Sequence, residues 1–378
     1  MNEGEFLHLK EEVAAFAEGR TEEIAAALEE GKTSGAEVRK ELRERGYLRL
    51  AVPEDLGGMG LSFVRYLELM ELFGRTHGTI RTIVHVANGI WRAVDQLATP
   101  EQRERFVRPL VRGEVSVAFT MSEPDSGAGA DLKSYVRREG DSYYLTGEKH
   151  MITFGLTADY LLAFARTEGS AGAQGTVALL VPRGSPGVKA HEMPPAMGLR
   201  GTDYARISFR DVPVPLEGRL GEEGEGLRVA FEGFLAPSRI AVAMSCVGLA
   251  AKALDLAAEH ARRRITFGKP LASRQAIQHL LAGMATDLEA ARQLVYWAGR
   301  RWEEGEGLVA SSKAKLFATE MLQRVTDGAL QVHGGIGYFA GAPMERIYRD
   351  ARVQRFEEGT AEVQKALIAR DLLGKEGS

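Results

Sequence analysis

Two adjacent carboxylates, Glu357 and Glu358, stand just before the pair Gly359-Thr360 near the end of the chain. A carboxylate acts as a general base when it lies in a water-poor pocket, because loss of solvation raises its pKa toward neutrality. Alone, an acidic residue before Gly-Thr is most often the N-terminal carboxylate of a helix, where the helix dipole favours it. A chemical role for Glu358 therefore needs support from other parts of the chain.

Three other segments carry residues that suit binding. They read MSEPDSG from Met121, RITFGK from Arg264 and QVHGGIGY from Gln331. Taken singly, these segments predict a helix cap or turn, a helix C-terminus stopped by glycine, and a loop. Whether these segments form one binding site depends on the helices and strands that bring them together.

Several common catalytic and nucleotide-binding patterns are missing from the sequence. No G-x-G-x-x-G follows a predicted strand and opens a helix, which disfavours an NAD-linked dehydrogenase. There is no P-loop, no H-E-x-x-H and no G-x-S-x-G, and the eight histidines are scattered, so no metal site is predicted. Cys246, the only cysteine, lies in an apolar run, where we expect it to be a buried packing residue.

Chain length, net charge and the length of the apolar runs restrict the class of protein further. A chain of 378 residues exceeds one compact core, so two or three domains are expected. A net charge of -4 gives no electrostatic footprint for nucleic acid. Apolar runs reach only about a dozen residues, too short for a bilayer of ~30 Å, and the first residues lack the layout of a signal peptide. A cytoplasmic enzyme without a membrane partner is expected.

The first part of the chain is predicted to be helical. Apolar residues recur at helical spacing in residues 11–30, 40–47, 61–73 and 80–97. A further helix should begin at Pro100, with Thr99 as its cap. These helices predict an N-terminal all-α domain, residues 1–114.

The sequence pattern changes from helical to β-prone after residue 114, and it becomes helical again after residue 220. Short β-prone runs separated by Gly, Pro and Asp predict strands at residues 115–120, 141–146, 159–165, 176–181 and 205–209. Without helices between them, such strands favour an antiparallel barrel or sandwich. The fold class expected is therefore α+β, with a middle antiparallel β-barrel over 115–220. A C-terminal four-helix bundle should follow over 221–378, with helices at 227–264, 275–304, 311–332 and 360–373.

Taken together and in this order, the segments resemble the acyl-CoA dehydrogenase family over essentially the whole chain. The segment from Glu148 to Thr153 resembles a second flavin-facing strand of that family, and Glu358-Gly359-Thr360 its catalytic E-G-T motif. The resemblance implies FAD as cofactor, an acyl-CoA thioester as substrate and a trans-2-enoyl thioester as product. It also implies a homotetramer built as a dimer of dimers, electron-transfer flavoprotein as the acceptor, and a place in fatty acid or amino acid catabolism.

The same resemblance implies roles for individual residues. Glu358 would remove the α-proton, its backbone N–H and a ribityl hydroxyl would stabilise the enolate, and the β-hydride would pass to flavin N5. The segment starting at Arg264 would reach the FAD of a neighbouring subunit. The implied FAD-binding residues are Phe119, Met121, Ser122, Met151, Thr153, Arg264, Thr266, Phe267, Gln275, Gln331, Gly334, Gly335, Thr360 and Glu362. The implied substrate-binding residues are Arg81, Ser126, Arg239 and Gly359.

Four positions depart from the family pattern, mostly on the substrate side. The first motif, read from Glu123 to Asp131, is two residues longer than the common form. Met151 stands where an aromatic residue is usual, Ala236 where many members have aspartate, and Glu357 where tyrosine is common. We expect Glu357 to have a surface or rim role. Some branches carry the base at the position of Ser238, which leaves that task here to Glu358.

Arg81 stands in an otherwise apolar predicted helix, where burying a guanidinium is costly unless it meets an anion. The glutaryl-CoA dehydrogenase branch has an arginine followed by a serine at the matching place, where it binds a distal carboxylate; Thr82 replaces that serine here. Alternatively, Arg81 points to solvent or pairs with a local glutamate. Two further readings of the whole chain stay open. One is another flavin enzyme on this scaffold, namely an acyl-ACP dehydrogenase, oxidase or monooxygenase; the other is a non-catalytic helical binding protein.

Overall fold

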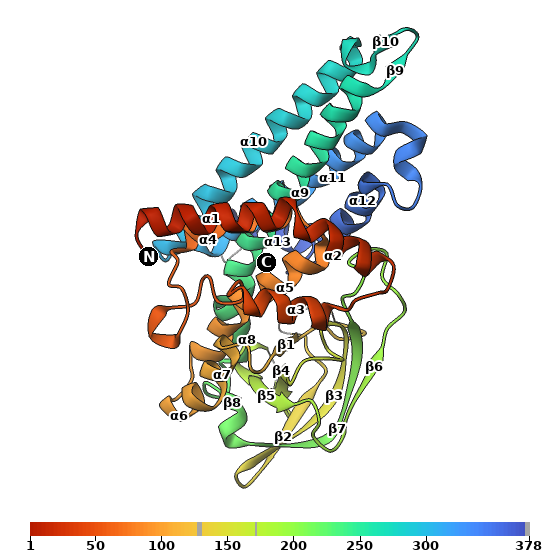
Figure 1. Ribbon diagram of the computed structural model, residues 1–378. Helices are drawn as coiled ribbons and strands as arrows, with labels where there is room; N and C mark the ends of the chain where they lie inside the picture. Colours follow the sequence, from red (N-terminus) through yellow and green to blue (C-terminus); the bar gives the residue numbers. More distant parts are fainter. Residues whose placement is uncertain (127–130, 171, 375–378) are drawn as a thin grey trace.

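The computed structural model describes residues 1–126, 131–170 and 172–374, and Figure 1 shows a sheet beneath helices from both ends of the chain. The N-terminal helices are α1 Glu3–Glu18, α2 Arg20–Glu29, α3 Gly35–Glu44, α4 Phe63–Gly74, α5 Gly78–Asp95, α6 Pro100–Gln102 and α7 Arg108–Val111. A π-helical turn, Arg103–Val107, joins α6 to α7. The helix predicted over 11–30 is two helices broken at Gly19, and Thr99 caps α6 as expected.

The middle part is a mixed, open sheet. Its strands are β1 Val117–Thr120, β2 Tyr135–Glu139, β3 Ser142–Thr153, β4 Tyr160–Thr167, β5 Thr176–Pro182, β6 Val188–Glu192, β7 Tyr204–Pro215 and β8 Arg219–Leu220. They run in the order β6-β7-β3-β2-β4-β5-β8, and β1 pairs with β4. The predicted closed antiparallel barrel is therefore wrong: β6 and β8 are edges, and both β1 and β2 run parallel to β4. Strand spacing along the chain predicts that strands exist but not which of them pair.

The C-terminal part is built on three long helices. Its elements are α8 Gly226–Ala230, a π-helical turn Phe231–Leu235, α9 Ala236–Arg263, a hairpin of β9 Ile265–Thr266 and β10 Lys269–Pro270, α10 Gln275–Glu303, α11 Gly307–His333, α12 Pro343–Val353 and α13 Ala361–Leu373. Short 3-10 turns lie at Glu54–Leu56, Ala173–Gly175, Leu216–Gly218, Leu271–Ser273 and Gly334–Tyr338. The helices α12 and α13 both pack on α11.

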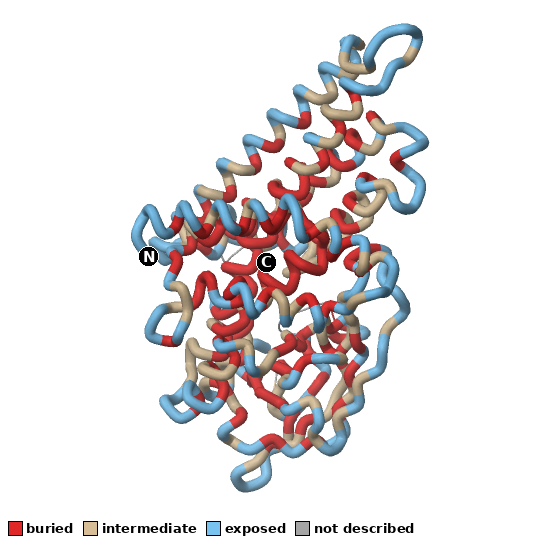
Figure 2. The backbone as a smooth tube through the Cα atoms, viewed as in Figure 1, coloured by how far each residue is buried: buried red, intermediate tan, exposed pale blue. Residues whose placement is uncertain are grey.

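The buried residues gather where α4, α5 and α9 cross, whereas the far end of α9 and α10 is exposed (Figure 2). Cys246 of α9 is buried as predicted, and burial raises the pKa of its thiol to about 12. Within the described residues, one helical stretch, Gly226–Arg263, is long and apolar enough to cross a membrane by length and composition. Its most apolar window is 78 % buried inside the protein, as expected of a core helix.

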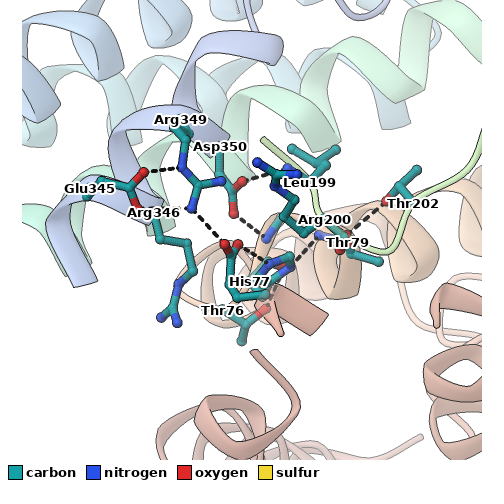
Figure 3. Close-up of polar contacts among 12 residues, drawn as sticks. Thr76, His77, Thr79, Leu199, Arg200, Thr202, Glu345, Arg346, Arg349 and Asp350 are labelled. Atoms are coloured by element: carbon teal, nitrogen blue, oxygen red, sulfur yellow. Dashed lines mark hydrogen bonds and ion pairs between the residues drawn. The ribbon is translucent and has the colours of Figure 1, made fainter. Parts of the chain in front are cut away.

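Asp350 of α12 joins the three parts of the chain (Figure 3). Its two buried oxygens accept hydrogen bonds from the backbone N–H of Gly78 in α5, at 3.0 Å, and of Leu199 after β6, at 2.7 Å. The approach is too close for larger residues: a Cβ added at Gly78 would lie 2.8 Å from the Leu199 side chain, and one at Gly198 would lie 2.8 Å from the Arg349 backbone. Two glycines therefore allow this junction.

His77, which precedes α5, strengthens the junction (Figure 3). Its Nδ1 accepts the Thr79 N–H at 3.1 Å, so Nε2 carries the proton that it donates to Glu29 at 3.2 Å. Arg349 donates to the other oxygen of Glu29 at 2.8 Å. Burial opposes ionisation of Glu29, but these two hydrogen bonds outweigh it and lower the pKa of that carboxyl to about 2.

Candidate active site

Glu358 lies on a strained turn between α12 and α13. Both Glu358 and Gly359 have left-handed backbone, with φ of 54° and 97°. Such a conformation costs a glutamate about 1–3 kcal/mol and persists only where the surroundings hold it. Strain of this kind at a carboxylate marks the turn as a candidate functional site.

Side chains from three helices hold this turn through its carbonyl groups. Arg239 of α9 donates to the Glu358 carbonyl at 3.0 Å, and Lys315 of α11 donates to the Gly359 carbonyl at 2.6 Å. Gln364 of α13 donates to both carbonyls, each at 3.1 Å. Burial lowers the pKa of Lys315 to about 8. The sequence predicted Arg239 for this site but missed Lys315 and Gln364, which stand in helices without a recognisable motif.

Two side chains of α5 face the two carboxylates. Arg81 Nη2 donates to Glu357 Oε1 at 2.8 Å, and His85 Nε2 lies 3.5 Å from Glu358 Oε1. The side chains of Arg81 and His85 are 2 % and 3 % exposed, and those of Glu357 and Glu358 are 19 % and 12 % exposed. Because residues four apart lie on one face of a helix, Arg81 and His85 form a single polar stripe.

The expected surface or rim role of Glu357 is wrong, because this carboxylate is the counter-ion of a buried arginine. Burial opposes ionisation of Glu357, but the field of Arg81 and its hydrogen bond prevail and lower the pKa of the carboxyl. The predicted substrate residue Arg81 thus pairs with a glutamate of its own chain. His85 was missed, although its position one helical turn after Arg81 was the available signal.

The first motif and the end of β3 meet on the sheet. The Ser122 carbonyl accepts the His150 N–H at 3.0 Å. Beneath them, Lys149 Nζ donates to the Met121 carbonyl at 3.1 Å, to the Phe164 carbonyl at 2.6 Å and to Glu123 at 2.8 Å. Burial lowers the pKa of Lys149 to about 8, against the attraction of Glu123. Lys149 therefore fixes the motif, a role that the sequence did not reveal.

The other predicted residues of this region lie nearby. A bulge between Lys149 and Ile152 interrupts the pairing of β3 with β7, and Met151 within it has φ of 56° and is 56 % exposed. Thr153 ends β3, and the Phe119 ring packs 4.8 Å from that of Phe164. Ser126 is buried, and its hydroxyl has no hydrogen-bond partner among the described residues. The predicted extra length of this loop falls partly on residues 127–130, outside the described part of the chain.

A third group of predicted residues lies at the end of the long helices. The rings of His260 and His333 stack with centroids 4.6 Å apart, which brings the ends of α9 and α11 together. Arg264, Thr266 and Phe267 follow α9, Gln275 begins α10, and Gln331, Gly334 and Gly335 lie at the end of α11. Figure 1 places the β9–β10 hairpin at the end of the helices farthest from the sheet, so one chain does not bring the hairpin to the flavin-facing strand β3. Thr360 and Glu362 begin α13, beside the Glu358 turn.

The described residues fit a flavin dinucleotide, in two separated places. Beside the sheet, Met151 offers an exposed thioether to a planar ring. At the helix ends, Phe267 is 98 % and Tyr338 76 % exposed, so both rings are open to contact by a ligand or a second chain. A Cβ added at Gly334 or Gly335 would meet nothing within 4 Å, so their backbone is open to close approach by phosphate. A held carboxylate together with surfaces that fit a flavin is the arrangement expected of an oxidoreductase site.

Comparison with known proteins supports this class along nearly the whole chain. Family models described as the acyl-CoA dehydrogenase N-terminal, middle and C-terminal domains match residues 4–114, 118–212 and 224–373. The human mitochondrial short-chain specific acyl-CoA dehydrogenase is 36 % identical over 95 % of this chain and 87 % of its own. The caffeyl-CoA reductase-Etf complex subunit CarC of Acetobacterium woodii is 36 % identical over 95 % and 96 %.

The solved structures agree. Butyryl-CoA dehydrogenase from Megasphaera elsdenii superimposes with a TM-score of 0.91 at 32 % identity, over 99 % of this chain and 100 % of that one. The chain belongs to the acyl-CoA dehydrogenase family.

Proposed function

We propose that this protein catalyses the α,β-dehydrogenation of a short acyl-CoA thioester, with Glu358 as the base that takes the α-proton. The observation that carries the proposal is the carboxylate of Glu358, 12 % exposed on a left-handed turn that Arg239, Lys315 and Gln364 hold in place. FAD, when bound, supplies the acceptor for the β-hydride. The Glu358 backbone N–H would polarise the thioester carbonyl and stabilise the enolate.

The substrate class follows from the charges around Glu357. Arg81 already has a counter-ion in Glu357, so a second carboxylate on the acyl chain would meet a guanidinium whose charge is offset and would be repelled by Glu357. We therefore propose a monocarboxylic acyl group. The names of the human and Megasphaera relatives support a short chain.

An anaerobic titration tests the reaction. We expect butyryl-CoA, added stoichiometrically to the FAD-loaded protein without oxygen, to bleach the yellow flavin absorbance, and an artificial electron acceptor to restore it. Bleaching by an acyl carrier protein thioester but not by butyryl-CoA would contradict the CoA proposal. Rapid oxygen consumption after reduction would indicate an oxidase. A colourless purified protein that cannot be reconstituted with FAD would favour the non-catalytic reading.

The subunit arrangement follows from the separation of the two flavin-fitting places. Because one chain holds the sheet and the β9–β10 hairpin far apart, we propose that each FAD lies between two chains, in a homotetramer. We expect light scattering to give a multiple of the 41.2 kDa chain, together with one flavin per chain. Phe267→Ser should lower FAD content and oligomer mass together. A flavin-loaded monomer would contradict the shared site.

We further propose electron-transfer flavoprotein as the physiological electron acceptor. The support is the Acetobacterium woodii relative, whose name places it in an Etf complex.

A further inference from the structure

His85 occupies a buried position between two groups of the site. Its Nε2 lies 2.9 Å from Ser238 Oγ of α9 and 3.5 Å from Glu358 Oε1. The imidazole ring is 3 % exposed and packs 6.1 Å from the Phe234 ring. Its other nitrogen, Nδ1, is buried without a hydrogen-bond partner among the described residues. A buried polar ring with both neighbours on one nitrogen calls for a specific function.

The geometry rules out a nucleophile relay. In a Ser-His-acid triad, serine and carboxylate contact opposite nitrogens of the ring, so that the base can take the serine proton. Here Ser238 and Glu358 contact the same nitrogen. Ser238 is therefore placed to orient the ring, not to attack a substrate.

The protonation state of Glu358 decides which proton arrangement on His85 is favourable. With the proton on Nε2, the ring donates toward the ionised carboxylate and the Ser238 hydroxyl. With the proton on Nδ1, the Nε2 lone pair accepts the Ser238 hydroxyl and faces the carboxylate, an arrangement that repels ionised Glu358. The 3.5 Å separation is an electrostatic contact, longer than the usual length of a hydrogen bond.

We propose that His85, oriented by Ser238, is a positioning residue that donates its Nε2 proton toward Glu358 and keeps that carboxylate ionised and aimed at the substrate. The inference rests on the proposed function, in which Glu358 is the base. A hydrogen bond to the charged form of an acid opposes the effect of burial, which favours the neutral form. His85 keeps its proton throughout, so no proton passes along this contact.

The other charges that face Glu358 act in both directions. Arg239 of α9 and Lys315 of α11 favour the ionised carboxylate, whereas the neighbouring Glu357 disfavours it and is itself offset by Arg81 of α5. Tyr204 of β7 also lies in the field of Arg81 and Glu357. Removing His85 alone leaves these groups in place, so the change should appear as a shifted pH dependence and not as loss of the site.

The test compares His85→Leu, His85→Gln and Ser238→Ala with butyryl-CoA and an artificial electron acceptor. His85→Leu should lower kcat by about 10- to 100-fold, the range of one hydrogen bond to a charged group, and move the acid limb of the pH profile upward. His85→Gln, which keeps an N–H donor, should recover most of both effects. Ser238→Ala should give a smaller change, because it removes only the orienting contact. FAD content, Tm and KM should stay near those of the wild type.

The possible results distinguish failure of the His85 inference from failure of the proposed function. An unchanged acid limb in His85→Leu, or no recovery in a folded His85→Gln, would overturn the positioning role. If His85→Leu does not fold, Ser238→Ala still decides, because the positioning role predicts an upward shift of its acid limb and a purely structural histidine predicts a pH profile identical to the wild type. A wild-type protein inactive with every acyl-CoA tested would reject the proposed function itself.

Discussion

Glu358→Gln should lower turnover of butyryl-CoA by about 10³-fold or more while FAD and thioester still bind, because the amide cannot accept the α-proton. The substitution preserves shape, and the contacts that hold the turn go to the backbone carbonyl of Glu358 and not to its side chain. The measurement is kcat with an artificial electron acceptor, alongside flavin content and the binding constant for the thioester.

A matched control is Glu44→Gln, an exposed carboxylate on α3, which should leave kcat unchanged. Near-normal turnover in Glu358→Gln would show that another group removes the proton. Loss of flavin together with activity would show that Glu358 supports the fold of the site.

Glu357→Gln should change both stability and substrate preference. It leaves the guanidinium of Arg81, 2 % exposed, without its counter-ion, and breaking a buried ion pair in this way costs about 3–5 kcal/mol. A carboxylate at the far end of the acyl chain can then replace the lost charge. We expect the kcat/KM ratio of glutaryl-CoA to butyryl-CoA to rise by about tenfold or more. Glutaryl-CoA should also raise the Tm of this variant more than that of the wild type.

The double variant Arg81→Gln/Glu357→Gln is the control. It removes both charges, so it should regain most of the lost stability and show no preference for the dicarboxylate. If the wild type already prefers glutaryl-CoA, the counter-ion role of Glu357 fails and Arg81 binds the substrate directly. If Glu357→Gln leaves the ratio unchanged, the ion pair is structural only. Turnover of butyryl-CoA by Glu357→Gln should exceed that of Glu358→Gln in either case.

Local pattern predicted the order of helices, strands and helices, the cap at Thr99 and the burial of Cys246. It also placed the motifs in the correct family. Local pattern failed to predict features that depend on contacts between residues distant in sequence. Which strands pair with β4 is decided by the sheet as a whole, so the expected barrel is an open sheet.

The candidate site was likewise predictable from the sequence only in part. The turn that carries Glu358 was recognisable because its residues are consecutive. Glu357, however, pairs with Arg81, which lies 276 positions away along the chain. The sequence marked His85 only by its spacing from Arg81 and gave no local signal for Lys149, because the role of a buried lysine depends on its neighbours in space. These long-range contacts are what the sequence alone could not supply.

The hydrogen bonds of Asp350 limit how parts of this protein can be exchanged with those of a relative. One oxygen fixes the start of α5, the helix that carries Arg81 and His85, and the same aspartate stands on α12, which leads into the Glu358 turn. The hydrogen bond from Gly78 to Asp350, which lies outside the site, therefore helps to set how Glu357 and Glu358 face Arg81 and His85. The second oxygen of Asp350 connects this arrangement to the loop at Leu199. Chimeras that exchange one part with a relative should stay active only when the aspartate and the glycines at positions 78 and 198 come from compatible parents.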